Sequence, residues 1–149
     1  MHILIVDDNE RIVELVTWFL TERGFRVDRA SGFVEARAHL ERGAPDLMLS
    51  DIDLGAEDGR VELWALARAG VLPPTLVVSG YLSAEVLASL DGLPGLVGTL
   101  AKPFDFEVLE AKIRACLALE GAPPDPGPRP EAVEDDDGWI EVQPALEGE

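Results

Sequence analysis

The chain has 149 residues, of which 47% are hydrophobic, which is enough to bury the core of one ordinary domain. Its formal net charge of −17 argues against direct binding to nucleic acid or to anionic lipid, since both need a basic surface. A single cysteine, Cys116, excludes an internal disulfide and suits a reducing compartment. Because the sequence shows neither a signal-peptide pattern nor a run of about 18 apolar residues, we expect a soluble, cytoplasmic protein.

Apolar spacing predicts short strands alternating with helices along the first 120 residues. The strands are expected near residues 3–6, 25–29, 47–50, 75–78 and 96–100, and the helices near 12–20, 34–40, 61–67, 84–90 and 108–117. Asp8 or Asn9 can cap the first helix, and Gly24 is placed to end it. Five strand–helix units predict a parallel α/β sheet covered on both faces. Trp18, Trp64 and Cys116 fall in apolar helical patterns and are expected to pack inside.

The composition changes at Gly121. Residues 121–149 hold nine acidic residues and one arginine, and prolines crowd their first ten positions. A segment of this kind buries too little apolar surface to offset the entropy lost on ordering. We therefore expect one folded domain over residues 1–120, followed by a disordered acidic tail over residues 121–149.

Charged residues stand at the ends of three predicted strands. Asp7 and Asp8 follow the first strand, Asp51 follows the third, and Lys102 follows the fifth. In an open parallel sheet the carboxyl ends of the strands share one edge, which is where ligands bind. Closely packed carboxylates repel one another, and a hard cation such as Mg²⁺ relieves this repulsion. A carboxylate can also attack phosphorus, so these residues predict a metal and phosphoryl site.

Lys102 and Ser79 have side chains that fit a phosphoryl site. The ammonium of Lys102 is a compact charge that suits a phosphoryl oxygen. Pro103 holds the lysine in an extended conformation, and the bond between them is of the kind that can be cis. Ser79 ends the fourth strand with a hydroxyl that can bond to a phosphoryl oxygen.

Taken in order, the motifs resemble those of a known family. They are Ile5–Asp8, Pro45–Asp51, Asp58-Gly59, Ser79-Gly80 and Lys102–Phe104. Over residues 1 to about 120 the chain is similar to the receiver domain of two-component response regulators. The resemblance implies a flavodoxin-like fold, a doubly wound five-stranded parallel sheet in the order 2-1-3-4-5.

The resemblance also implies roles for individual residues. Asp51 is the expected phosphoacceptor, supplied by a histidine kinase or a histidine phosphotransfer protein. For Mg²⁺, Asp8 is expected to bind directly, Asp7 mainly through water, and Asp53 through its backbone carbonyl. The phosphoryl oxygens are expected to contact Ser79 and Lys102. A receiver of this kind is a substrate of a kinase more than an enzyme, and its phosphorylation is read by a partner protein.

The sequence departs from the family pattern in three places. Thr99 stands where the family usually has an aromatic residue, which Tyr81 could replace. Asp53 stands at an often apolar position beside the phosphoacceptor, and we hypothesise that its charge changes the lifetime of the phosphoryl group, which Asp53→Met would test. Gly55-Ala56-Glu57 replaces the common proline-glycine-apolar turn and suggests a loose, flexible loop.

No helix-turn-helix, basic stretch or catalytic module follows residue 120, so a stand-alone receiver is expected, with its oligomeric state left open between a monomer and a weak dimer. Two alternatives remain at this stage. The chain could be an interaction module that no longer responds to phosphate, as Thr99 and Asp53 would allow. It could also be an aspartate-nucleophile phosphohydrolase, because Asp53 lies two residues after Asp51.

Overall fold

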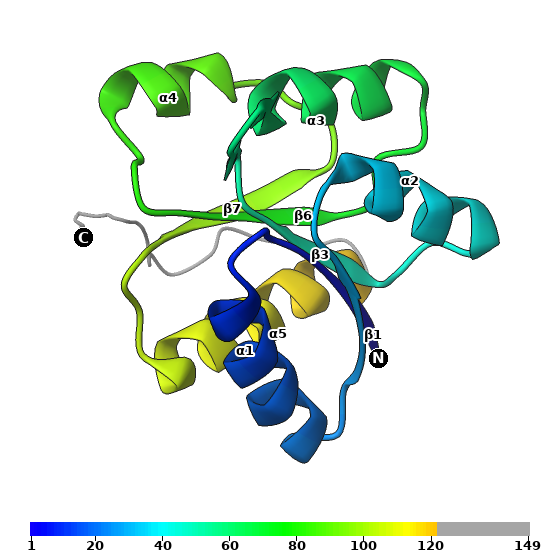
Figure 1. Cartoon of the computed structure of the whole chain (residues 1–149), viewed down its shortest axis with the longest axis vertical. Helices are drawn as coiled ribbons and strands as arrows, with labels where there is room; N and C mark the ends of the chain where they lie inside the picture. Colours follow the sequence, from blue (N-terminus) through cyan, green and yellow to red (C-terminus); the bar gives the residue numbers. More distant parts are fainter. Residues whose placement is uncertain (122–149) are drawn as a thin grey trace, which may run out of the picture.

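The computed structural model describes residues 1–121 (Figure 1). Its elements alternate as the sequence predicts, with one addition after the third strand. They are β1 (His2–Val6), α1 (Glu10–Glu22), β2 (Arg26–Ala30), α2 (Phe33–Arg42), β3 (Leu47–Ser50), β4 (Asp53–Leu54), β5 (Glu57–Asp58), α3 (Gly59–Arg68), β6 (Thr75–Ser79), α4 (Ala84–Ser89), β7 (Leu96–Ala101) and α5 (Phe106–Gly121).

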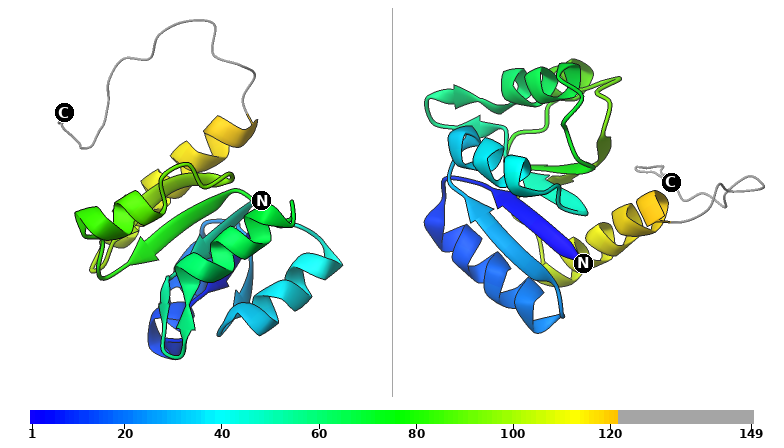
Figure 2. Two further views of the ribbon diagram at one scale, coloured as in Figure 1. Left: turned by 90° about the horizontal axis from the view of Figure 1, so that it is seen from above. Right: turned by 90° about the vertical axis from the view of Figure 1, so that its right-hand side faces the viewer.

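The main sheet has five parallel strands in the order β2-β1-β3-β6-β7. Because β6 and β7 are the fourth and fifth strands of the sheet along the chain, this is the predicted order 2-1-3-4-5. Helices α1 and α5 cover one face, and α2, α3 and α4 cover the other (Figures 1 and 2). The doubly wound fold predicted from the sequence is therefore confirmed.

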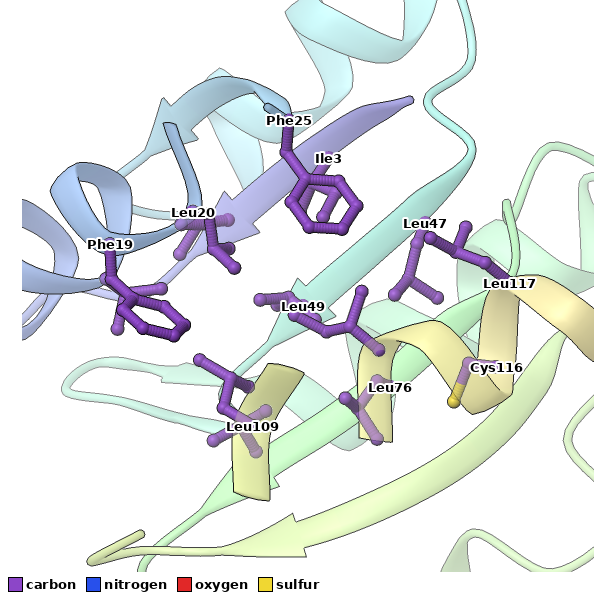
Figure 3. Packing of buried hydrophobic residues seen from close by; sticks show 14 of the residues in the cluster. Ile3, Phe19, Leu20, Phe25, Leu47, Leu49, Leu76, Leu109, Cys116 and Leu117 are labelled. Carbon is purple, nitrogen blue, oxygen red and sulfur yellow. The ribbon is translucent and has the colours of Figure 1, made fainter. Parts of the chain in front are cut away.

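The three central strands, β1, β3 and β6, are buried on both faces, which explains their continuous apolar runs. Along β1, Ile3 and Ile5 belong to the core under α1 and α5, whereas Leu4 and Val6 belong to the core under α2, α3 and α4. Figure 3 shows the first of these cores, where side chains of β1, β3 and β6 meet those of α1 and α5. Cys116 is 3% exposed in this core, as expected.

Helix ends follow from local chemistry. Of the two predicted caps for α1, Asn9 is the one used: its side-chain oxygen accepts a hydrogen bond from the amide of Ile12 at 3.1 Å. Gly24 follows the helix with φ of +93°, a conformation that favours glycine. The cap at Asn9 starts α1 at Glu10, one residue after the Asp7-Asp8 pair.

Two expectations are wrong. Residues 53–58 form an antiparallel hairpin of β4 and β5 in place of the flexible loop, because Gly55 (φ +68°) allows a tight turn between the two strands.

Trp18 is 61% exposed and does not pack in the core, because the buried face of α1 is formed by Val13, Val16 and Leu20.

Trp64 is partly buried and packs against the core under α2, α3 and α4, as expected. Its Nε1 donates a hydrogen bond to the carbonyl of Ser89 at 3.0 Å. The domain boundary at residue 120 and the disorder of residues 121–149 stay predictions, because residues 122–149 lie outside the described part of the chain.

Candidate functional site

The ends of four strands bring the predicted site residues to one edge of the sheet. Asp7 and Asp51 directly follow β1 and β3, Ser79 ends β6, and Lys102 directly follows β7. The parallel pairing continues past the strands: the amide of Asp51 donates to the carbonyl of Val6 at 2.9 Å, and the amide of Lys102 donates to that of Ser79 at 2.8 Å. Backbone pairing of neighbouring strands therefore fixes the positions of these residues.

One ammonium lies between two buried carboxylates. Nζ of Lys102 donates to Oδ2 of Asp7 at 2.7 Å and to Oδ2 of Asp51 at 3.0 Å. Asp7 is 7% exposed and Asp51 is 8% exposed, so both charges lie largely away from water. Buried carboxylates require such a partner, because an unpaired charge loses most of its hydration. The Lys102–Pro103 bond is cis.

The pKa of Lys102 reflects two opposing effects. Burial alone would lower the pKa of the ammonium, since it disfavours the charged form. The hydrogen bonds from Lys102 to Asp7 and Asp51, together with the charges of these carboxylates, outweigh burial and raise the pKa above its usual value of 10.5. Lys102 is therefore a permanent cation at neutral pH.

Backbone amides hold the second oxygen of each buried carboxylate. Oδ1 of Asp51 accepts from the amides of Ile52 at 2.7 Å and Asp53 at 3.1 Å. Oδ1 of Asp7 accepts from the amide of Asn9 at 2.9 Å. An ionised carboxylate held in one orientation is a suitable nucleophile toward phosphorus, because its attacking oxygen needs no reorganisation.

The remaining acids lie at the surface of the site. Asp8 and Asp53 are exposed, and Oδ2 of Asp8 lies 3.7 Å from the position that a Cβ on Gly55 would take. Within residues 1–121, no three acidic, histidine or cysteine side chains are gathered closely enough to form a metal-binding group. The structure thus brings Asp7 and Asp51 together, with Asp8 exposed next to the hairpin, and the role of these acids as metal ligands stays a prediction.

The donor set fits a magnesium ion nonetheless. Mg²⁺ is usually held by one or two carboxylates together with water molecules and phosphate oxygens, so a dedicated cage of protein ligands is not needed. Asp7 and Asp51 present carboxylates that already share one cation, and the exposed Asp8 is open to solvent beside them. These residues have the oxygen chemistry that the ion requires.

A cavity of about 330 Å³ lies beside the phosphoacceptor candidate and includes Asp53, Ser79 and Tyr81 in its lining. Ser79 is 1% exposed, and its Oγ accepts from the amide of Tyr81 at 3.2 Å. Tyr81 itself is 71% exposed, and Thr99, at the position discussed above, is partly buried on β7. Neither residue places a buried aromatic ring at the site.

Sequence reasoning noted Glu57 only as part of a turn and missed the contact that it makes from the hairpin. Its Oε1 accepts a hydrogen bond from the amide of Phe33 at 3.1 Å, so the hairpin is joined to the first residue of α2. One feature of the sequence could have indicated this contact. Gly32 precedes α2 and has no side chain to cap the helix, so the cap has to come from a residue elsewhere in the chain.

The five-stranded doubly wound sheet, with polar residues at the carboxyl ends of its strands, defines a flavodoxin-like α/β protein. The family model of the response regulator receiver domain matches residues 3–114. The chain therefore belongs to the receiver domain family of two-component response regulators.

Curated relatives agree with this assignment. Response regulator Rre1 of Synechocystis is 34% identical over 131 residues, which cover 85% of this chain and 56% of that protein. Response regulator MprA of Mycobacterium leprae is 36% identical over 118 residues, covering 78% of this chain and 51% of that protein. The chain thus spans about half the length of the curated relatives that it matches.

Solved structures show the same fold. A two-component response regulator from Clostridium difficile has a TM-score of 0.71 and 25% identity, with 82% of this chain and 99% of that chain covered. A CheY-like receiver domain protein from Methanospirillum hungatei has a TM-score of 0.71 and 29% identity, covering 80% of this chain and 94% of that one. In residues 1–121, no helix has the length and apolar character needed to cross a membrane.

Proposed function

We propose that Asp51 accepts a phosphoryl group from a histidine kinase or a histidine phosphotransfer protein in a Mg²⁺-dependent reaction. The observation that carries this proposal is the buried carboxylate of Asp51, held by Lys102 on one oxygen and by two backbone amides on the other. Membership of the receiver family favours this function over an aspartate-nucleophile phosphohydrolase.

In the proposed reaction, the ionised carboxylate of Asp51 attacks the phosphorus of a phosphohistidine on the donor. A P–O bond to Asp51 forms as the P–N bond breaks, and the imidazole, protonated on its other ring nitrogen, leaves as a neutral ring with the electron pair of that bond. Asp51 gives up no proton, so the step needs no general base on this chain. The product is an aspartyl phosphate and an unmodified histidine.

Two side chains are placed to stabilise the charge on the transferring group. Lys102 already contacts the carboxylate of Asp51 and can move its contact to a phosphoryl oxygen. The hydroxyl of Ser79, at the end of the neighbouring strand, can donate to another of these oxygens. Mg²⁺, held by Asp7, Asp8, Asp51 and the carbonyl of Asp53, would supply further neutralisation of the phosphoryl charge.

The phosphorylated form would act by binding. The added charge at Asp51 would change the contacts of Ser79 and Lys102 and shift the population of surface conformations that a partner protein recognises. The chain would accordingly be a cytoplasmic phosphoprotein of a phosphorelay that makes no direct contact with nucleic acid and has at most self-phosphorylation and self-dephosphorylation activity.

Intact mass after incubation with acetyl phosphate tests this proposal. We expect wild type to gain one phosphoryl group in the presence of Mg²⁺, and Asp51→Asn to gain none. Removal of Mg²⁺ with a chelator should abolish the gain in wild type. An unmodified wild type, with acetyl phosphate and with phosphorylated donor proteins alike, would refute the proposal and favour an interaction module that does not respond to phosphate.

A further inference from the structure

The first turn of α2 takes its cap from another part of the chain. The residue before the helix is Gly32, which has no side chain, and the four leading amides of any helix need partners from outside the helix. Here the amide of Phe33 donates to the carboxylate of Glu57 at 3.1 Å. A negative charge at this end is also favoured by the helix dipole.

Gly32 provides the space for this contact. A Cβ at residue 32 would lie 2.9 Å from Oε1 of Glu57, which is closer than real Cβ contacts allow. The backbone of Gly32 is extended, with φ of −170° and ψ of −174°, a conformation that any residue adopts. The absence of a side chain at residue 32 is thus needed for the approach of Glu57 and not for the backbone conformation.

Glu57 belongs to the β4–β5 hairpin, whose residues line one side of the cavity described above. It pairs across the hairpin with Leu54, which is 6% exposed and directly follows Asp53 on β4. The amide of Asp53 in turn donates to Oδ1 of Asp51 at 3.1 Å. A continuous series of contacts therefore runs from the start of α2, through Glu57 and the hairpin, to the carboxylate of Asp51.

We propose that Glu57 is a positioning residue that fixes the β4–β5 hairpin against α2 and so holds the backbone of Asp53 in place beside Asp51. Its effect on metal affinity and on phosphorylation rests on the function proposed above. Its effect on the hairpin does not, and it can be measured without metal or phosphodonor.

Four single variants of the full chain and one double variant, Gly32→Ala with Glu57→Ala, test the proposal. Glu57→Ala removes the acceptor for the amide of Phe33, whereas Glu57→Gln keeps an oxygen in the same place. Gly32→Ala places a methyl group where the carboxylate now lies. Glu35→Ala is the matched control, because Glu35 accepts hydrogen bonds from Ser31 at the same end of α2 and no hydrogen bond joins it to the hairpin.

Amide hydrogen exchange, followed by nuclear magnetic resonance without metal, is the first measurement. Since one hydrogen bond contributes on the order of 1 kcal/mol, we expect Glu57→Ala to speed exchange at Phe33 and Asp53 about fivefold. Glu57→Gln should stay near wild type. Gly32→Ala should act like Glu57→Ala in the wild-type background and add nothing when Glu57 is already alanine.

Titration with Mg²⁺ alone, followed by the amide shift of Asp53, is the second measurement. We expect the dissociation constant to rise about fivefold in Glu57→Ala and to stay unchanged in Glu35→Ala. Equal effects of Glu57→Ala and Glu35→Ala on the amide of Asp53 would overturn the proposal. So would an effect of Gly32→Ala that is the same with and without Glu57. If Asp51 proved not to be phosphorylated, the exchange result would be unaffected.

Discussion

The main residue-scale feature is a single ammonium that serves two buried carboxylates. Lys102 contacts both Asp7 and Asp51 and is itself only 19% exposed. Loss of the ammonium would leave two like charges facing each other in a site with little water. The loss in the free energy of unfolding is large, because a buried charge without its partner has given up its hydration and gained no interaction in return.

We predict that Lys102→Met lowers the free energy of unfolding by about 3 kcal/mol in the absence of divalent cations. Mg²⁺ should restore part of this loss, because it can neutralise the same two carboxylates. Denaturant titrations with and without Mg²⁺ measure both effects. The chain's other lysine, Lys112 on α5, gives the control: Lys112→Met should show no recovery with Mg²⁺.

The raised pKa of Lys102 sets the pH range of this stabilisation. A group whose pKa is higher in the folded state stabilises fully below its unfolded pKa, here near 10.5, and the stabilisation disappears as the pH rises through the folded pKa. The stability difference between wild type and Lys102→Met should therefore stay constant between about pH 6 and about pH 9. A difference that shrinks within this range would contradict the assignment.

The location of this cluster could be predicted from the sequence, because Asp7, Asp51 and Lys102 each follow an apolar run and parallel strands share their carboxyl edge. The sequence could not predict that Asp8 stays exposed at the rim. Neighbouring residues after a strand point in different directions, and only the backbone conformation of the loop decides which of them turns inward.

At the scale of single elements, the start of α3 is the tightest point of the site. A Cβ on Gly59 would lie 2.5 Å from Cα of Ile52 and 3.0 Å from the carbonyl oxygen of Asp51. Both neighbours are backbone atoms, which cannot turn away as a flexible side chain can. The helix therefore packs directly against the backbone of Asp51 and Ile52.

We predict that Gly59→Ala destabilises the protein by about 2 kcal/mol, since steric overlap outweighs the gain of up to about 1 kcal/mol that alanine brings to a helix. Thermal and denaturant unfolding measure the change. Gly80→Ala is the control, because no atom of residues 1–121 lies within 4 Å of its Cβ position and its backbone is not left-handed. Equal stability of the two variants would contradict the packing described here.

Most elements could be predicted because their apolar residues repeat at helical spacing or form short buried runs. The β4–β5 hairpin could not, since strands of two residues are too short to show any period. Its order comes from contacts made elsewhere, such as that of Glu57 with the amide of Phe33. The prediction that Trp18 is buried was wrong although a pattern was present. Trp18 lies within an apolar helical pattern, and only the packing of α1 shows that its side of the helix faces water.

For the molecule as a whole, the charge of −17 is the dominant property. Self-repulsion opposes the folded state, and any salt reduces it by screening. A cation bound at the site would stabilise the folded protein by more than screening does, because it binds the folded form in preference to the unfolded chain. The two effects can be separated by comparing salts of equal ionic strength.

We predict that MgCl₂ raises the melting temperature more than NaCl of matched ionic strength. With free Mg²⁺ at about ten times its dissociation constant, the added stabilisation is about 1.4 kcal/mol, or roughly 5 °C. Asp8→Ala should keep the NaCl response and lose most of the extra Mg²⁺ effect, since Asp8 is exposed and its removal leaves the core unchanged. Identical responses to the two salts in wild type would argue against a metal site.

The central claim is that Asp51 is the phosphoacceptor, and chemical localisation tests it most directly. Borohydride reduces an acyl phosphate to an alcohol, so a phosphorylated aspartate is converted to homoserine. After treatment of wild type with acetyl phosphate and Mg²⁺, followed by borohydride, peptide mass spectrometry should find homoserine at residue 51 alone. Homoserine at residue 7, 8 or 53, with Asp51 intact, would contradict the account.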